Sequence, residues 1–165
     1  MIKAAIVTMS DKGSRGERED TSSEEIKKLL YEIPAELIEY TIIPDERKTI
    51  SDTLIKLCDE LQVDLIVTTG GTGVGCRDVT PEATKDVIDR EVPGMAEAMR
   101  MASLKKTPHA MISRAVVGMR KATLIINLPG SPKAVRENFS VVLPAIKHAV
   151  EKIKGDDADC ASPWH

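Results

Sequence analysis

Short apolar runs and amphipathic helical patterns alternate along the chain. Nearly continuous apolar runs at residues 3–9, 64–68 and 123–128, and a more alternating run at 36–43, predict four β-strands. Strands that are apolar on both faces are typical of parallel sheets covered by helices. The pattern therefore predicts a sheet that is buried in the middle of the domain.

Apolar residues between the strands recur with helical spacing in three stripes. The stripes are Ile26, Leu29, Leu30 and Ile33; then Ile50, Leu54, Leu57, Cys58 and Leu61; then Phe139, Val142, Leu143, Ile146, Val150 and Ile153. Pro144 lies inside the third stripe and is expected to kink or break that helix. Strands that alternate with such helices indicate βαβ units, so the predicted fold class is α/β, a single three-layer α/β/α domain.

Two stretches outside these patterns are harder to interpret. In the segment 90–122, methionines and leucine predict a helix around residues 95–104, and His109–Val117 is expected to form an irregular strand. The polar residues at 155–165 are expected to form a flexible C-terminal tail. We therefore expect one domain over residues 1–154.

Composition excludes several classes of protein. The 165 residues, at 18.0 kDa, fit one domain, and 42% hydrophobic with 30% charged residues is typical of a globular chain. A net charge of −3 and only four aromatic residues argue against nucleic-acid binding. No apolar run approaches the ~20 residues of a membrane span. Three cysteines at no metal-ligand spacing favour a reducing compartment, so we expect a cytoplasmic protein.

The segment Thr68–Thr80, TTGGTGVGCRDVT, carries the strongest candidate chemistry. It contains Thr69, Thr72 and four glycines, and a helix is expected to begin where Thr80 serves as N-cap. A glycine-rich loop that leads into a helix N-terminus is suited to bind anions. It matches neither the P-loop nor the dinucleotide fingerprint, because Cys76 and Arg77 stand where those motifs need other residues. The alternative is a tight turn without a ligand.

Three further segments follow predicted strands, where open α/β sheets bind ligands. In NLPGSP at 127–132, Pro129, Gly130 and Ser131 precede a helix that Ser131 is expected to cap, either as an anion site or only as a well-capped helix start. Asp45 follows the second strand and is either a functional acid or an N-cap. The polar residues Ser10, Asp11 and Ser14 follow the first strand, in a binding loop or a mobile surface loop.

Asp78 lies between the glycine loop and the expected cap. A carboxylate beside phosphate-binding amides is unfavourable unless a cation lies between them, so Asp78 is a candidate Mg²⁺ ligand with Asp45 as its partner. Arg114 could pair with phosphates through its fork of donors, or it could form a surface or interface salt bridge.

Taken together, these motifs resemble the molybdopterin adenylyltransferase family of molybdenum cofactor biosynthesis, which includes bacterial enzymes and the G domains of gephyrin and its plant counterpart. The resemblance covers roughly residues 3–153. It is carried by TTGGTG at 68–73, RDVTPEAT at 77–84, IPDE at 43–46, SD at 10–11 with Ser14, SR at 113–114 and NLPGSPK at 127–133.

The resemblance implies a mostly parallel, mixed central sheet and an enzyme that adenylylates molybdopterin with Mg²⁺-ATP and releases pyrophosphate. It implies that Asp45 and Asp78 are the essential acids, and that the glycine and LPGSP loops bind the substrates. It further implies a homo-oligomer, expected to be a trimer, that passes its product to a downstream molybdenum insertase. The alternative is a non-enzymatic molybdopterin carrier or scaffold, which retention of both acids argues against.

Overall fold

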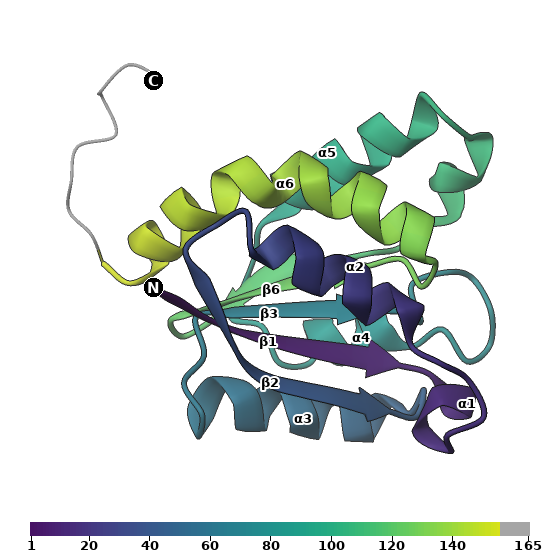
Figure 1. Cartoon of the computed structure of the whole chain (residues 1–165), viewed down its shortest axis with the longest axis horizontal. Coiled ribbons are helices and arrows are strands. Elements are labelled where there is room, and N and C mark those ends of the chain that lie inside the picture. The colour runs from purple at the N-terminus through teal and green to yellow at the C-terminus, as the bar shows by residue number, and fades with distance from the viewer. Residues whose placement is uncertain (156–165) are drawn as a thin grey trace.

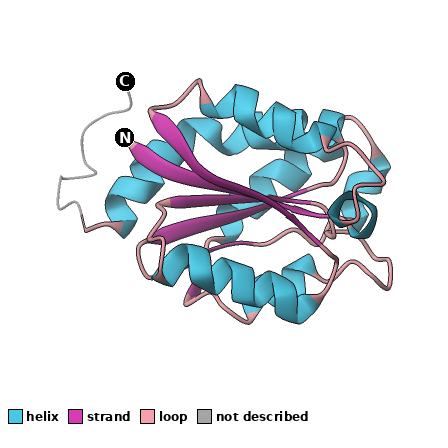
Figure 2. Cartoon of the chain, turned by 60° about the horizontal axis from the view of Figure 1, so that its bottom comes forward, coloured by secondary structure: helices cyan, strands magenta, loops and turns pink. Residues whose placement is uncertain are grey.

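In the computed structural model, which describes residues 1–155, a six-stranded sheet runs between two layers of helices (Figures 1 and 2). The strands are β1 (Ile2–Met9), β2 (Ala35–Ile43), β3 (Leu65–Thr69), β4 (Arg90–Glu91), β5 (Val117–Arg120) and β6 (Thr123–Leu128). Their order in the sheet is β2-β1-β3-β6-β5-β4. Strands β2, β1, β3 and β6 pair in parallel, whereas β5 and β4 are added antiparallel at the β6 edge. The three-layer α/β fold with a mostly parallel, mixed sheet is therefore confirmed.

The helices divide between the two faces of the sheet. They are α1 (Asp11–Ser14), α2 (Thr21–Leu30), α3 (Arg47–Asp59), α4 (Thr80–Lys85), α5 (Pro93–Leu104), the 3-10 helix η1 (Pro108–Ile112) and α6 (Pro132–Ile153). Helices α2, α5 and α6 cover one face, and α3 with α4 covers the other (Figure 1).

The two cores explain why the central strands are apolar at every position. Ile6 and Leu65 pack in the core beneath α2, α5 and α6, while their neighbours Val7 and Ile66 pack in the core beneath α3 and α4. All four side chains are fully buried. Because successive strand residues point to opposite faces, a strand covered on both sides needs apolar residues throughout.

The expected strand over His109–Val117 was wrong, and so was the expected break of the last helix at Pro144, whereas a kink at Pro144 stays a prediction. Residues 108–112 form η1 and not a strand, because Pro108 starts the turn and Thr107 caps it by accepting a hydrogen bond from the His109 N–H. Pro144 does not break α6, which is continuous from Pro132 to Ile153. Ser140, whose carbonyl loses its helical partner to this proline, is exposed, so water can replace the missing donor.

The carboxyl ends of the parallel strands lie at one edge of the sheet, with α1 beside the ends of β1 and β2 (Figure 1). All four candidate loops begin at this edge, since they follow β1, β2, β3 and β6. None of the helices formed by residues 1–155 is both long and apolar enough to cross a membrane. The expected tail lies outside the described residues, apart from its first residue.

Candidate functional site

The glycine loop after β3 adopts a backbone that favours glycine at two positions. Gly70 has φ +97° and Gly71 has φ +66°, both in the left-handed region. A Cβ at Gly70 would lie 2.4 Å from the Met9 carbonyl oxygen, and one at Gly71 would lie 2.4 Å from Thr80 Oγ1. The loop is thus pressed against the end of β1 and the start of α4.

Thr80 holds this loop in place but does not cap α4. It is the first residue of the helix, with Val79 in the capping position, and its buried hydroxyl donates a hydrogen bond of 2.9 Å to the Gly70 carbonyl. The predicted N-cap role was therefore wrong. The physical reason is that the loop folds back over the helix, so that the Gly70 carbonyl becomes the partner of the hydroxyl.

The Asp78 carboxylate faces the inside of the same loop. Its Oδ2 accepts a hydrogen bond of 2.8 Å from the Gly75 N–H. A Cβ at Gly73 would come within 2.8 Å of that oxygen, and one at Gly75 within 2.9 Å. The absence of side chains at these two positions leaves room for the carboxylate.

Asp45 is tied to the loop after β1 and does not cap α3. Its Oδ2 accepts a hydrogen bond of 2.9 Å from the Asp11 N–H, and its own N–H donates to Asp11 Oδ1 at 3.0 Å. The N-cap of α3 is Glu46, without a side-chain hydrogen bond. Burial raises the pKa of Asp45; the Asp11 N–H opposes this effect, and the nearby Asp11 and Asp78 charges add to it.

Arg77 was not singled out from the sequence, yet it completes this link. Its Nε and Nη2 donate to the two carboxylate oxygens of Asp11 at 3.0 and 2.9 Å. The Arg77 guanidinium is the main reason that the pKa of Asp11 lies below its usual value. The available signals were its position next to Asp78 and its place at the start of the RDVTPEAT motif, whereas its partner lies 66 residues away in sequence.

Arg114 is hydrogen-bonded to the glycine loop at several points. Its Nε donates to the Gly73 carbonyl at 2.7 Å, Nη2 donates to the Asp78 carbonyl at 2.6 Å, and Nη1 contacts the Glu82 carboxylate. Its backbone N–H donates to the Thr72 carbonyl at 2.9 Å. Contact between Arg114 and a substrate stays a prediction, since these contacts engage the guanidinium with the loop itself.

The loop after β6 packs directly against the glycine loop. Thr69 Oγ1 donates to the Pro129 carbonyl at 2.7 Å, and a Cβ at Gly130 would lie 3.4 Å from the Gly70 Cα. Ser131 Oγ accepts from the Ala134 N–H at 3.2 Å, so the predicted cap of α6 is confirmed. The tertiary structure thus brings residues 69–73 and 129–131 together.

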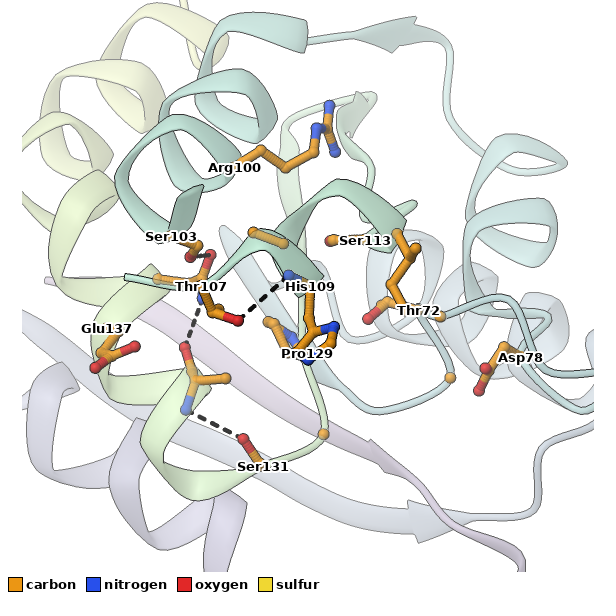
Figure 3. Close-up of a pocket in the computed structure, with 17 residues that line it drawn as sticks. Thr72, Asp78, Arg100, Ser103, Thr107, His109, Ser113, Pro129, Ser131 and Glu137 are labelled. Atoms are coloured by element: carbon orange, nitrogen blue, oxygen red, sulfur yellow. Dashed lines mark hydrogen bonds between the residues drawn. The ribbon is translucent and has the colours of Figure 1, made fainter. Parts of the chain in front are cut away.

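Two hollows meet at these loops, and they share Gly71, Asp78, Gly130 and Ser131. The first, of about 430 Å³, continues between α5, η1 and α6, and we call it the α5–α6 hollow. Figure 3 shows it with Asp78 on one side and with Glu137 and Ser131 of the α6 region on another. The second, of about 320 Å³, continues between the ends of β1 and β2 and the start of α2, and we call it the β1–α2 hollow.

Of the three residues predicted in the loop after β1, only one borders a hollow in the structure. Ser10 borders the β1–α2 hollow and caps α1 by accepting from the Gly13 N–H at 2.9 Å. Asp11 and Ser14 border neither hollow; Ser14 Oγ donates to the Asp11 carbonyl at 2.9 Å. Substrate contact by Asp11 and Ser14 thus stays a prediction, with Asp11 held between Asp45 and Arg77.

Asp20 is a further acid in the β1–α2 hollow that sequence reasoning missed. Its carboxylate accepts hydrogen bonds from the Thr8 hydroxyl at 2.6 Å, the Tyr40 hydroxyl at 2.7 Å and the Ser23 N–H at 3.0 Å. Burial acts to raise the pKa of Asp20, but these hydrogen bonds outweigh it and hold the pKa below its usual value. The α5–α6 hollow likewise contains unforeseen polar side chains, Arg100, Ser103, Thr107, His109, Glu137 and Asn138.

Within the described part of the chain, no group of three or more His, Cys, Asp or Glu side chains is arranged to hold a metal ion. Asp45 and Asp78, however, both border the β1–α2 hollow. Mg²⁺ is commonly held by one or two carboxylates together with substrate phosphates and water. The two carboxylates therefore fit a Mg²⁺ ion whose other ligands would be phosphate oxygens of a bound substrate and water.

Comparison with known proteins points to one family. A family model described as a probable molybdopterin binding domain matches residues 5–148. A molybdopterin adenylyltransferase of Helicobacter pylori strain J99 is 48% identical over 157 residues, which cover 94% of this chain and 89% of the relative. Gephyrin of Dictyostelium discoideum is 46% identical over 88% of this chain and 21% of its own length. The crystal structure of the molybdopterin biosynthesis enzyme MoaB from Thermus thermophilus has a TM-score of 0.89 and 48% identity over the whole of both chains.

Proposed function

This chain belongs to the family of molybdopterin-binding domains, and we propose on that premise the reaction that it catalyses. It is a molybdopterin adenylyltransferase of molybdenum cofactor biosynthesis. In the proposed reaction, a phosphate oxygen of molybdopterin attacks the α-phosphorus of ATP. The new phosphorus–oxygen bond forms as the bond to the β-phosphate oxygen breaks, and pyrophosphate leaves.

The observation that carries this proposal is the meeting of two hollows at the paired loops. A transfer between two substrates requires a binding volume for each and a shared wall where the reacting phosphates come together. The shared wall here consists of the glycine loop, the start of α6 and Asp78. A carrier of a single ligand would need only one of the two volumes.

The residues of the shared wall suit the charge that develops during the transfer. Gly71 and Gly130 bring backbone close to the substrates without a side chain between them. The N-terminus of the 22-residue helix α6, capped by Ser131, presents the positive end of a helix dipole. Because the attacking phosphate is already ionised, the protein needs to supply orientation and charge stabilisation but no general base.

We propose that Asp45 and Asp78 hold Mg²⁺ together with the phosphates of ATP. The ion would neutralise phosphate charge and stabilise the departing pyrophosphate. The two carboxylates supply oxygen ligands at the edge of the β1–α2 hollow, where the hydrogen bond from the Asp11 N–H orients Asp45 and the one from the Gly75 N–H orients Asp78.

Incubation of the protein with molybdopterin, ATP and Mg²⁺, with pyrophosphate and adenylyl-molybdopterin both measured, tests this function. We expect equal amounts of the two products, and none without Mg²⁺. A non-enzymatic carrier or scaffold would bind molybdopterin and release no pyrophosphate, and that result would refute the proposed activity.

We propose further that the chain forms a homo-oligomer, expected to be a trimer. Apolar side chains are exposed on α5 and η1: Met101 at 66%, Leu104 at 42%, Met111 at 72% and Ile112 at 52%. Burying such a surface would favour association. Sedimentation equilibrium at micromolar concentration should give three times 18.0 kDa, whereas a single 18.0 kDa species would refute assembly. A cytoplasmic location and transfer of the product to a downstream molybdenum insertase complete the proposal.

A further inference from the structure

We propose that Arg77 is a positioning residue which, through Asp11, fixes the carboxylates of Asp45 and Asp78 relative to each other. This inference rests on the proposed function, because it concerns the two acids assigned to Mg²⁺-ATP. Arg77 borders neither hollow, so it acts on the site through its contacts and not by touching a substrate.

The order of the strands creates the need for such a link. Asp45 follows β2 and Asp78 lies in the loop after β3, and in the sheet β1 separates these two strands. No hydrogen bond joins the two acids directly among those found for the described residues. Asp11 follows β1, the strand between them, and is therefore placed to connect the two loops.

The contacts form a continuous chain across the three strand ends. The loop that carries Asp78 provides Arg77, whose planar fork binds both carboxylate oxygens of Asp11 at 3.0 and 2.9 Å. Asp11 in turn exchanges two hydrogen bonds with Asp45: the backbone N–H of each residue donates to the carboxylate of the other residue. Every step is a pair of hydrogen bonds, which fixes orientation as well as distance.

Charge also requires a cation at this position. Asp11, Asp45 and Asp78 lie on adjacent loops, and the negative charges of Asp11 and Asp78 both act against the charge of Asp45. Arg77 attracts Asp11 and Asp45 electrostatically, while Arg114 is occupied with the carbonyls of the glycine loop and with Glu82. Removing the Arg77 charge would therefore let the loops that carry the acids move apart.

The ion pair between Arg77 and Asp11 is open to solvent. Its effect on function can therefore be measured apart from its effect on the stability of the fold. The Arg77 side chain is 58% exposed and that of Asp11 is 30% exposed. Exposed ion pairs contribute little to the free energy of unfolding. A variant that breaks the link should therefore fold normally and still lose function.

The test compares Arg77→Gln, Arg77→Lys and Asp11→Asn with a matched control, Arg47→Gln. Arg47 forms a bidentate pair with Asp86, with both hydrogen bonds at 2.7 Å, and its side chain is about as exposed as that of Arg77. It also joins two separate elements. Three quantities are measured: pyrophosphate release, the affinity for Mg²⁺-ATP by calorimetry without molybdopterin, and the midpoint of thermal unfolding.

We expect Arg77→Gln to lose about 10–100-fold in turnover and in Mg²⁺-ATP affinity, as is typical when a group that orients metal ligands is removed. Its unfolding midpoint should stay within about 4 °C of the parent. Arg77→Lys should recover only part of the loss, because an ammonium group keeps the charge but lacks the fork. Arg47→Gln should match the parent in turnover and affinity.

Combining Arg77→Gln with Asp11→Asn separates a shared role from two independent roles. If the residues act in one chain of contacts, the double variant loses no more than the worse single variant. The inference would be overturned if the fold-losses of the two single variants multiplied in the double variant. It would also be overturned if Arg77→Lys recovered full activity, or if Arg47→Gln lost as much turnover and affinity as Arg77→Gln. If the parent protein is active and Arg77→Gln keeps its turnover and affinity, the role of Arg77 is refuted but the proposed function stands. An inactive parent protein would refute the proposed function.

Discussion

Replacing Gly71 by alanine tests whether the glycine loop is shaped by its packing against α4. Gly71 has φ +66°, and an added Cβ would lie 2.4 Å from Thr80 Oγ1 and 3.2 Å from Asp45 Oδ1. Thr80 is fully buried, and its hydroxyl donates to the Gly70 carbonyl. The substitution therefore strains the backbone and also disrupts a buried hydrogen bond.

The expected destabilisation follows from these two effects. A left-handed conformation costs a non-glycine residue about 1–2 kcal/mol, and leaving a buried hydrogen-bonding group without its partner costs about 1–3 kcal/mol. Gly71→Ala should therefore lower the free energy of unfolding by about 2–5 kcal/mol. Pyrophosphate release by the folded variant should fall as well, since the new methyl group presses on Asp45.

Gly16→Ala is the matched control, and urea unfolding followed by circular dichroism is the assay. Gly16 has φ +73°, but a Cβ there meets nothing within 4 Å, so only the backbone cost of about 1–2 kcal/mol remains. In a Thr80→Ala background, the cost of Gly71→Ala should fall towards that of the control, because the closest contact is removed and only the 3.2 Å approach to Asp45 remains. An equal cost for Gly71→Ala and Gly16→Ala in the parent would refute the packing explanation.

Three further predictions address the site and the fold. Asp78→Asn keeps an acceptor for the loop N–H, so it should leave the unfolding midpoint unchanged and reduce pyrophosphate release about 10²–10³-fold; near-normal turnover would show that its charge is dispensable. Ser131→Ala removes the cap of α6 and should cost about 1 kcal/mol in urea unfolding, and an unchanged midpoint would contradict this role. The Arg120 guanidinium is the main cause that lowers the pKa of Asp59 to about 2, so this carboxylate stabilises the fold fully above its ordinary pKa of 3.8 and less as the pH falls towards 2. Asp59→Asn should therefore lower the unfolding midpoint at about pH 7 but not at about pH 2, and equal losses at both would refute the linkage.

Much of the fold could be predicted because local patterns carry it. The near-continuous apolar runs became β1, β3 and β6, since a strand covered by helices on both faces must be apolar at every position. The methionine-rich stripe became α5, and Ser131 caps α6 as predicted. The antiparallel edge of the sheet was harder to predict from the sequence, because β4 has two residues and is too short to leave a periodic signal.

The candidate site was predicted as a set of loops but not as a set of roles. Position after a strand was enough to locate Asp45, Asp78 and the loops of residues 69–73 and 129–131, because parallel strands end at one edge of the sheet. Local capping rules failed for Thr80 and Asp45. Each finds a partner on another segment, and such a partner competes with the neighbouring backbone for the same side chain.

The type of fold, the family and the edge of the sheet that carries the candidate site could all be predicted from the amino-acid sequence, because periodicity, glycine content and strand ends are local properties of the chain. The contacts of Arg114 with the glycine loop and of Arg77 with Asp11, in contrast, become visible only in the folded domain. Their partners lie 41 and 66 residues away. Which side chains meet across such separations depends on the order of strands in the sheet, and that order is set by the packing of the whole domain.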